Sequence, residues 1–196
     1  MFDKRHFIKE SLKESAEVKN KILSSCEADI IKIADIFVGA FSNGNKIMFC
    51  GNGGSAADSQ HLATELIIRL SHKIKRPALP AVALTTDSST LTAGGNDIGF
   101  ENVLARVVEG LGKDGDILVV ISTSGNSENL CRAVEKAHLL NVNTVGFLGG
   151  NGGKLRNLTK HNIIIPSSNI QRIQEGHITI GHIICEIVEN ELYNHL

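Results

Sequence analysis

The chain has 196 residues, a length that suits a single domain with a sizeable hydrophobic core. Its 20 basic and 21 acidic residues leave a formal net charge of −1, which indicates neither a nucleic-acid surface nor a membrane-binding patch. No apolar run reaches the roughly 18 residues that a membrane span requires, and the first residues lack the apolar stretch of a signal peptide. The four cysteines are widely separated, so we expect a cytoplasmic protein with reduced thiols in its core.

Helical periodicity predicts two helices at the N-terminus, over residues 3–24 and 27–42. The second has the stronger apolar stripe, and residues 42–45 end it with glycine and asparagine, which suit a left-handed cap. The first has only a thin apolar stripe, which leaves it little core to cover within one subunit. It either packs on a second subunit or forms a loosely held arm.

A strand, a glycine-rich turn and the start of a helix follow one another between Lys46 and Arg69. Residues 46–50 form the predicted strand, and the turn that follows reads Gly51-Asn52-Gly53-Gly54-Ser55. Glycines let the backbone approach an anion, and the first N–H groups of a helix lack internal partners, so this geometry suits phosphate. Ser55 can cap the helix. The pattern is neither a dinucleotide fingerprint nor a Walker loop, and alone it is equally compatible with a plain turn.

The rest of the chain alternates between strands and helices. Apolar runs predict strands at residues 81–84, 117–121, 144–148 and 163–165. Helical spacing predicts a short helix that is capped by residues 85–89, reaches Ala93 and breaks at residues 94–97, and further helices at residues 100–111, 128–140, 154–157 and 171–193. This alternation predicts an α/β fold, a three-layer doubly wound parallel sheet flanked by helices, in one domain over residues 1–196.

A second polar loop, Ser122-Thr123-Ser124-Gly125-Asn126-Ser127, follows the predicted strand at residues 117–121. A helix cap would account for one or two of its hydroxyl groups, and it accounts for the whole set less well. Ligands of parallel sheets bind at the carboxyl ends of strands, and both loops occupy such positions. We therefore expect the two loops to face one crevice and to form a phosphosugar site.

His61 and Glu65 lie four residues apart, so they share one face of the predicted helix. This spacing suits a metal site or an acid/base pair, although by itself it is more often a chance pair on a solvated face. Gln174 and His182 lie eight residues apart on the last helix, about two turns, and can project to the same side. His182 stands in an apolar stretch, where a lone histidine is more often a core residue than a ligand.

Four segments together resemble the phosphoheptose isomerases, which are sedoheptulose 7-phosphate isomerases of the sugar isomerase (SIS) fold. The segments are Cys50–Ser55, Gly95-Asn96-Asp97, Ile121–Ser127, and Arg172-Ile173-Gln174-Glu175 with His177. They occur in the family's order and span nearly the whole chain. The serine-rich loop marks SIS domains generally, whereas the last segment, together with His61 and Glu65, is more specific.

The resemblance implies an enzyme that converts sedoheptulose 7-phosphate to D-glycero-D-manno-heptose 7-phosphate by acid/base chemistry through an enediol. Glu65 matches the family's general base and His182 its general acid. The reaction is the first step toward the ADP-heptose or GDP-heptose of bacterial lipopolysaccharide or capsule. The family is a homotetramer with active sites at subunit interfaces, which would give the helices of residues 1–42 a partner surface.

The resemblance also implies one Zn²⁺ per subunit, with His61, Glu65, Gln174 and His182 as its ligands. A histidine bound to zinc is not at that moment a protonated acid, so a catalytic, an inhibitory and a structural role for the metal all stay open. The positions that match substrate-binding residues of the family, or residues near them, are Asn52, Gly53, Gly54, Ser55, Glu65, Arg69, Asn96, Asp97, Ser122, Thr123, Ser124, Ser127 and Gln174.

The chain departs from the family just before Arg172, where Ile170-Gln171 replaces an acidic or small polar pair. This difference puts the exact sugar in question, but not the reaction class. The main alternative is a non-catalytic SIS-domain protein that binds a phosphosugar or, like one relative of similar length, the replication initiator DnaA. That relative lacks the carboxylate and the imidazole at the positions of Glu65 and His182.

Two further alternatives are a regulatory sugar-phosphate sensor and an isomerase of six-carbon phosphosugars. A sensor normally carries its SIS domain beside a DNA-binding or transferase domain, for which this chain has no room. The zinc-ligand pattern and the Arg-Ile-Gln-Glu segment argue against a six-carbon substrate.

Overall fold

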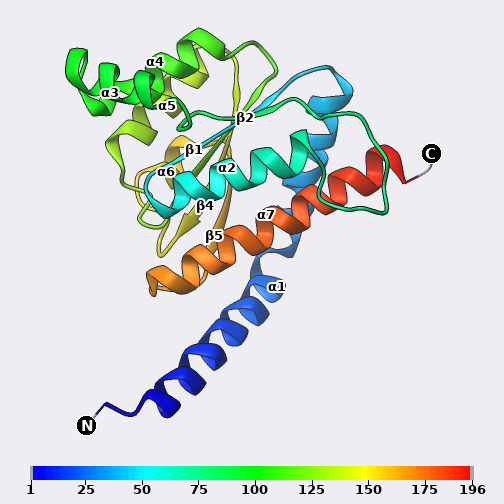
Figure 1. The fold of residues 1–196 in the computed structure, drawn as a ribbon, viewed down its shortest axis with the longest axis vertical. Helices are drawn as coiled ribbons and strands as arrows, with labels where there is room; N and C mark the ends of the chain where they lie inside the picture. The colour runs from blue at the N-terminus through cyan, green and yellow to red at the C-terminus, as the bar shows by residue number, and fades with distance from the viewer. Residues whose placement is uncertain (1, 195–196) are drawn as a thin grey trace.

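The computed structural model describes residues 2–194 and contains a five-stranded sheet with strand order β2-β1-β3-β4-β5 (Figure 1). The strands are β1 (Ile47–Gly51), β2 (Ala81–Ala83), β3 (Ile117–Ser122), β4 (Asn143–Gly149) and β5 (His161–Ile165). Each of the four strand pairings is parallel, which confirms the predicted doubly wound parallel sheet. The order reverses between β1 and β3, and open sheets of this kind bind ligands at such a switch point.

Helices cover both faces of the sheet, which confirms the predicted three layers (Figure 1). One face is covered by α1 (Lys4–Ser42), α2 (Gly54–Ile67) and α7 (Ile170–Tyr193). The other face is covered by α4 (Phe100–Leu111), α5 (Glu128–Leu139) and α6 (Leu155–Leu158), with α3 (Ser88–Asp97) packed against α4. In the part of the chain that the structure describes, no helix is both long and apolar enough to cross a membrane.

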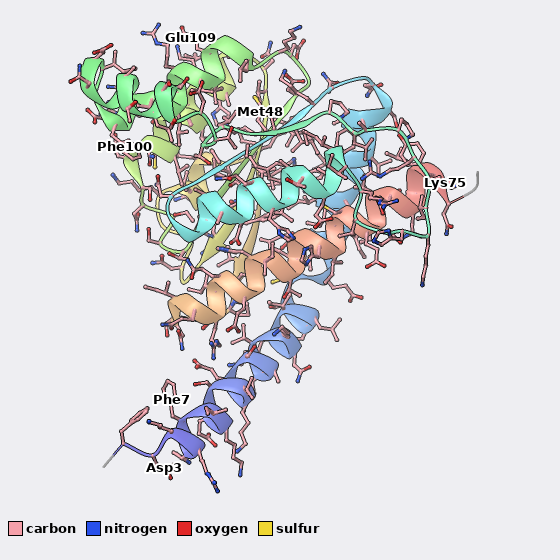
Figure 2. The ribbon with its side chains drawn as sticks, in the orientation of Figure 1. Asp3, Phe7, Met48, Lys75, Phe100 and Glu109 are labelled. Carbon is pink, nitrogen blue, oxygen red and sulfur yellow. The ribbon has the colours of Figure 1, made fainter. Side chains whose placement is uncertain are left out.

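The two faces of the sheet carry separate hydrophobic clusters. Ile47 and Phe49 of β1 pack under α1, α2 and α7, whereas Met48 and Cys50 face the opposite cluster. Side chains of a strand alternate between its two faces, so a strand covered on both faces reads as a continuous apolar run. Figure 2 shows Met48 in the interior. The four cysteines are buried and free, as expected from the sequence.

The prediction of two N-terminal helices was wrong, because α1 is one continuous helix of 39 residues. The carboxylate of Asp3 accepts hydrogen bonds from the N–H groups of Arg5 and His6 and caps the helix start. Where the break was expected, the hydroxyls of Ser24 and Ser25 donate to the carbonyl of Lys21 one turn earlier. These polar side chains therefore stay inside the helix rather than ending it.

The first part of α1 extends away from the rest of the molecule (Figure 1). Buried residues of α1 begin at Val18, whereas Phe7, Ile8 and Leu12 are each more than half exposed. Figure 2 shows Phe7 on this projecting part, close to the start of the helix. The thin apolar stripe predicted for this region is therefore largely exposed.

Two other boundaries differ from the sequence-based expectation. The predicted break at residues 94–97 is wrong, because α3 continues to Asp97. A Cβ atom at Gly94 would lie 2.8 Å from Cγ2 of Val103, so the glycine there permits close packing of α3 on α4. Helix α2 ends at Ile67 rather than Arg69, and the carbonyls of its last turn accept hydrogen bonds from the Arg76 side chain.

Candidate active site

The glycine-rich turn after β1 leads directly into α2, as predicted. The N–H of Ser55 donates to the carbonyl of Asn52, and that of Ala56 donates to the carbonyl of Gly53. The helix cap is Gly53, without a side-chain hydrogen bond, and Ser55 lies buried in the first turn. The prediction that Ser55 caps the helix was therefore wrong. The turn still directs the N-terminal end of α2, and with it the positive end of the helix dipole, toward the carboxyl edge of the sheet.

The serine-rich loop after β3 is held in shape by its own hydrogen bonds and by the loop after β4. The Ser122 hydroxyl accepts from the N–H of Gly125, whose φ is +64°. The Gly125 carbonyl accepts from the N–H of Leu155, and a Cβ atom at Gly125 would lie 2.0 Å from the carbonyl oxygen of Gly152. The loop therefore has a fixed conformation that a side chain at Gly125 would disrupt.

A pair of amides joins the two loops. Nδ2 of Asn52 donates to Oδ1 of Asn129 at 3.0 Å, and Nδ2 of Asn129 donates back to Oδ1 of Asn52 at 2.9 Å. Asn129 is buried near the start of α5 and was not among the predicted site residues. Its only sequence signal is a polar amide just inside a helix, which does not distinguish it from many surface residues.

A cavity of about 70 Å³ lies between the two loops. It is lined by Asn52, Ser55, Ile121, Ser122, Thr123, Ser124 and Ser127. Six of these seven residues are predicted substrate-binding positions, so the structure brings these parts of the two loops together around one space. Two helix starts and several hydroxyl groups adjoin a cavity without a charged side chain, which suits a small anion such as phosphate.

A second cluster joins α2 to α7. Nε2 of His61 lies 2.7 Å from Nε2 of His182 and 3.1 Å from Oε1 of Glu65. The three ligand-type atoms of these residues all lie within 4.8 Å of one another. The two Nε2 atoms are close enough for a hydrogen bond between the rings or for joint binding of a metal ion. The predicted acid/base residues therefore meet, although they lie more than a hundred residues apart in the sequence.

Close packing of α2 on α7 produces this meeting. A Cβ atom at Gly181 would lie 2.6 Å from Cδ2 of Leu62, so a larger residue there would force the buried Leu62 side chain or the helices to shift. The two helices also approach closely at Gln174. A Cβ atom at Gly54 would lie 2.6 Å from Nε2 of Gln174. Gln174 therefore adjoins the glycine-rich turn, while His182, two turns later, adjoins His61. The assignment of Gln174 as a metal ligand stays a prediction.

Asp58 adds a further carboxyl group that the sequence-based prediction did not include. It precedes His61 by three residues and Glu65 by seven, which places all three on one face of α2. Burial raises the pKa of Asp58, and the nearby imidazoles of His61 and His182 oppose that rise. Its Oδ2 atom is buried and has no hydrogen-bond partner among residues 2–194.

Three predicted substrate-binding residues lie outside both clusters. Arg69 is exposed just beyond the end of α2. Asn96 and Asp97 are exposed at the end of α3, where Nδ2 of Asn96 donates to Oδ1 of Asp97. Among residues 2–194, none of the three forms a hydrogen bond or ion pair with a residue of either cluster. Their roles at the site stay predictions.

Comparison with known proteins places this arrangement in a family. The profile of the SIS domain matches residues 11–149. The phosphoheptose isomerase of Clostridium acetobutylicum is 47% identical over 191 residues, covering 96% of each chain. The chain belongs to the phosphoheptose isomerase family. The family member from Aquifex aeolicus is 50% identical over 182 residues, covering 93% of this chain and 94% of that one.

Solved structures of phosphoheptose isomerases have the same fold. The structure from Francisella tularensis superimposes with a TM-score of 0.92 at 38% identity, over 96% of this chain and all of that one. A Vibrio vulnificus NanR protein in complex with ManNAc-6P matches with a TM-score of 0.59 at 14% identity, a likeness that shows the fold alone. The resemblance to phosphoheptose isomerases and the SIS fold inferred from the sequence are thus confirmed, and the chain is an isomerase.

Proposed function

We propose that the protein interconverts sedoheptulose 7-phosphate and D-glycero-D-manno-heptose 7-phosphate. The proposal rests on the proximity of Glu65 and His182, which lie on helices far apart in the sequence, to Nε2 of His61. Membership of the phosphoheptose isomerase family supports the reaction class. A non-catalytic adaptor or sensor would have no need of this acid/base pair, so the enzyme is the better account of the site.

The reaction moves one hydrogen between two carbons and another between two oxygens. Glu65 accepts a proton from C1 of the ketose, which produces an enediol, and returns it to C2 of the aldose. His182 transfers protons at O1 and O2, so that no net proton is gained or lost. The Glu65 side chain is only 18% exposed, which limits its hydration and favours proton transfer to and from carbon.

The two loops would hold the phosphate group of the sugar. The N–H groups at the start of α2 and the hydroxyls around the cavity are uncharged donors, and helix dipoles add a positive potential. Such a site would bind the phosphate without a salt bridge. The titratable side chains of the second cluster would then lie at the reacting end of the sugar. Gln174, which adjoins Gly54 and lies on the same side of α7 as His182, would contact the substrate between these two ends.

We also propose one Zn²⁺ per subunit, held by His61, Glu65, His182 and Gln174. Two imidazoles and a carboxylate within 4.8 Å of one another are a donor set that zinc prefers, so the residues fit the metal. When bound, the metal would supply a Lewis acid for the carbonyl and hydroxyl oxygens of the sugar. Nε2 of His182 cannot hold a proton and a metal together, so zinc binding and acid catalysis exclude each other at that atom.

The proposed product is the first intermediate on the route to nucleotide-activated heptose for lipopolysaccharide or capsule, and we place the reaction in the cytoplasm. We further propose that the enzyme is a homotetramer with active sites at subunit interfaces. The exposed apolar residues of α1 and an apolar groove of about 370 Å³ between α1 and α7 support such contacts. A neighbouring subunit would also bring Arg69, Asn96 and Asp97 near an active site.

Substitution of the acid/base residues tests the reaction. Glu65→Gln and His182→Gln should each lower kcat on sedoheptulose 7-phosphate by about 10²- to 10⁴-fold, because each removes a proton-transfer group. A coupled assay of aldose formation and the melting temperature measure the effect and the fold. Glu135→Gln, at an exposed position on α5, should keep full activity. Full activity in either site variant would remove the assigned acid/base pair.

Removal and return of zinc tests the metal site. Isothermal titration of chelator-treated protein with Zn²⁺ should give one site per subunit. His182→Gln should weaken this binding by at least about tenfold. His72→Gln, at an exposed histidine outside the site, should not change it. Equal zinc affinity in the wild type and His182→Gln would contradict the site.

Light scattering at assay concentrations tests the assembly. The wild-type protein should have the mass of a tetramer, and Leu12→Asp should lower that mass, because it places a charge on the exposed stripe of α1. Leu139→Asp is a matched control, since Leu139 is 77% exposed on α5 and away from α1. A monomeric wild-type protein would refute the proposed homotetramer.

A further inference from the structure

A fully buried ion pair lies beside the second cluster. Nε of Arg76, in the segment between α2 and β2, lies 2.7 Å from Oε1 of Glu189 on α7, and both side chains are 0% exposed. Two opposite charges are rarely withdrawn from water unless their remaining hydrogen-bonding groups are satisfied. The surroundings of this pair supply those partners.

The Arg76 guanidinium binds the C-terminal end of α2. Its Nη1 atom donates to the carbonyls of Leu66 and Pro77 at 2.7 and 3.0 Å, and its Nη2 atom donates to the carbonyl of Glu65 at 2.7 Å. The last carbonyls of a helix lack internal partners and carry the negative end of the helix dipole. Arg76 therefore caps α2 and bonds directly to the backbone of Glu65, the proposed base.

The Glu189 carboxylate fixes the other side of the pair. Its Oε1 accepts from the N–H of Leu70 at 3.0 Å, and its Oε2 accepts from the N–H of Ser71 at 3.2 Å. Both donors lie in the chain just after α2. Glu189 follows His182 by seven residues, about two turns, so it lies on the same side of α7. The carboxylate thus fastens the end of α2 to the helix that carries His182.

Cys185 lies on α7 between His182 of the site and Glu189 of the ion pair. Burial, together with the carboxylates of Glu65 and Glu189, raises the pKa of its thiol to about 12, and Arg76 opposes that rise. The thiol is therefore a neutral spacer at neutral pH. Cys185 belongs to the hydrophobic cluster that packs under α1, α2 and α7, so this part of α7 is fixed by apolar packing.

We infer that Arg76 and Glu189 are positioning residues of the reaction, which hold the end of α2 against α7 so that Glu65 stays within reach of His61 and His182. This inference rests on the proposed function. An apolar pair of similar volume would leave the carbonyls of Glu65 and Leu66 unpaired, so these charges support the fold as well as the position of the base. The planar guanidinium has donors in fixed directions, which set the orientation of α2 as a flexible lysine would not.

Replacement of the pair tests the inference. In the double variant Arg76→Met/Glu189→Met, both charges are removed together, and the melting temperature should fall, because the backbone groups of residues 65–71 that the pair binds lose their partners. Its kcat on sedoheptulose 7-phosphate should fall about 10- to 100-fold, the effect of a small displacement of a catalytic group, with KM changed less than about threefold. Arg106→Met, which breaks an exposed ion pair with Glu109 on α4, is the control and should leave both constants unchanged.

Arg76→Lys keeps the charge and decides the outcome if the double variant does not fold. It should lower kcat and weaken Zn²⁺ binding by about tenfold each, because its ammonium cannot bind both carbonyls and the carboxylate in the same geometry. A folded double variant, or a folded Arg76→Lys protein, with wild-type kcat and zinc affinity would overturn the inference. A wild-type enzyme that fails to convert sedoheptulose 7-phosphate would instead refute the proposed function. In that case the zinc affinities of the wild type and of Arg76→Lys would still test whether the Arg76–Glu189 pair positions the cluster.

Discussion

The contact between Gly181 of α7 and Leu62 of α2 is the constraint on which the site depends. Any side chain at position 181 would overlap Leu62, so a glycine there sets the separation of the two helices. Since α2 carries His61 and Glu65 and α7 carries Gln174 and His182, this separation decides whether the imidazoles and the carboxylate meet. The buried Arg76–Glu189 pair then fixes the same two helices at their C-terminal ends.

The parallel sheet places the other half of the site. β1 and β3 are neighbours at the point where the strand order reverses, so the loops that follow them begin at the same edge. The Asn52–Asn129 amide pair ties those loops around an uncharged cavity. The fold therefore places uncharged hydrogen-bond donors in the loops and a cluster of titratable groups between α2 and α7.

Much of this arrangement could be predicted from the sequence, because the signals were local. Apolar runs followed by glycine-rich or serine-rich loops mark β1 and β3, and alternation with helices implies the parallel sheet. The boundaries that were wrong depend on tertiary contacts: Gly94 stays helical because it packs on Val103, and α2 ends where Arg76 binds its carbonyls. Arg76 and Glu189 lie 113 residues apart, so no local pattern could pair them.

The two histidines of the last helix show the same limit. Both His177 and His182 stand among apolar residues, and the spacing alone does not distinguish a core histidine from a ligand. His177 is the core residue: it is fully buried, and burial lowers its pKa to about 4, so its ring is neutral. His182 is partly exposed and faces His61. Only the packing of α7 on α2 distinguishes the environments of these two histidines.

A crystal structure of the Glu65→Gln variant with sedoheptulose 7-phosphate tests the central claim most directly, since slow turnover would preserve the bound sugar. The account predicts the phosphate in the cavity between Asn52 and Ser127, with C1 and C2 beside residue 65 and the sugar oxygens within hydrogen-bond distance of His182. A phosphate bound elsewhere, or a sugar whose first two carbons lie away from both α2 and α7, would contradict it.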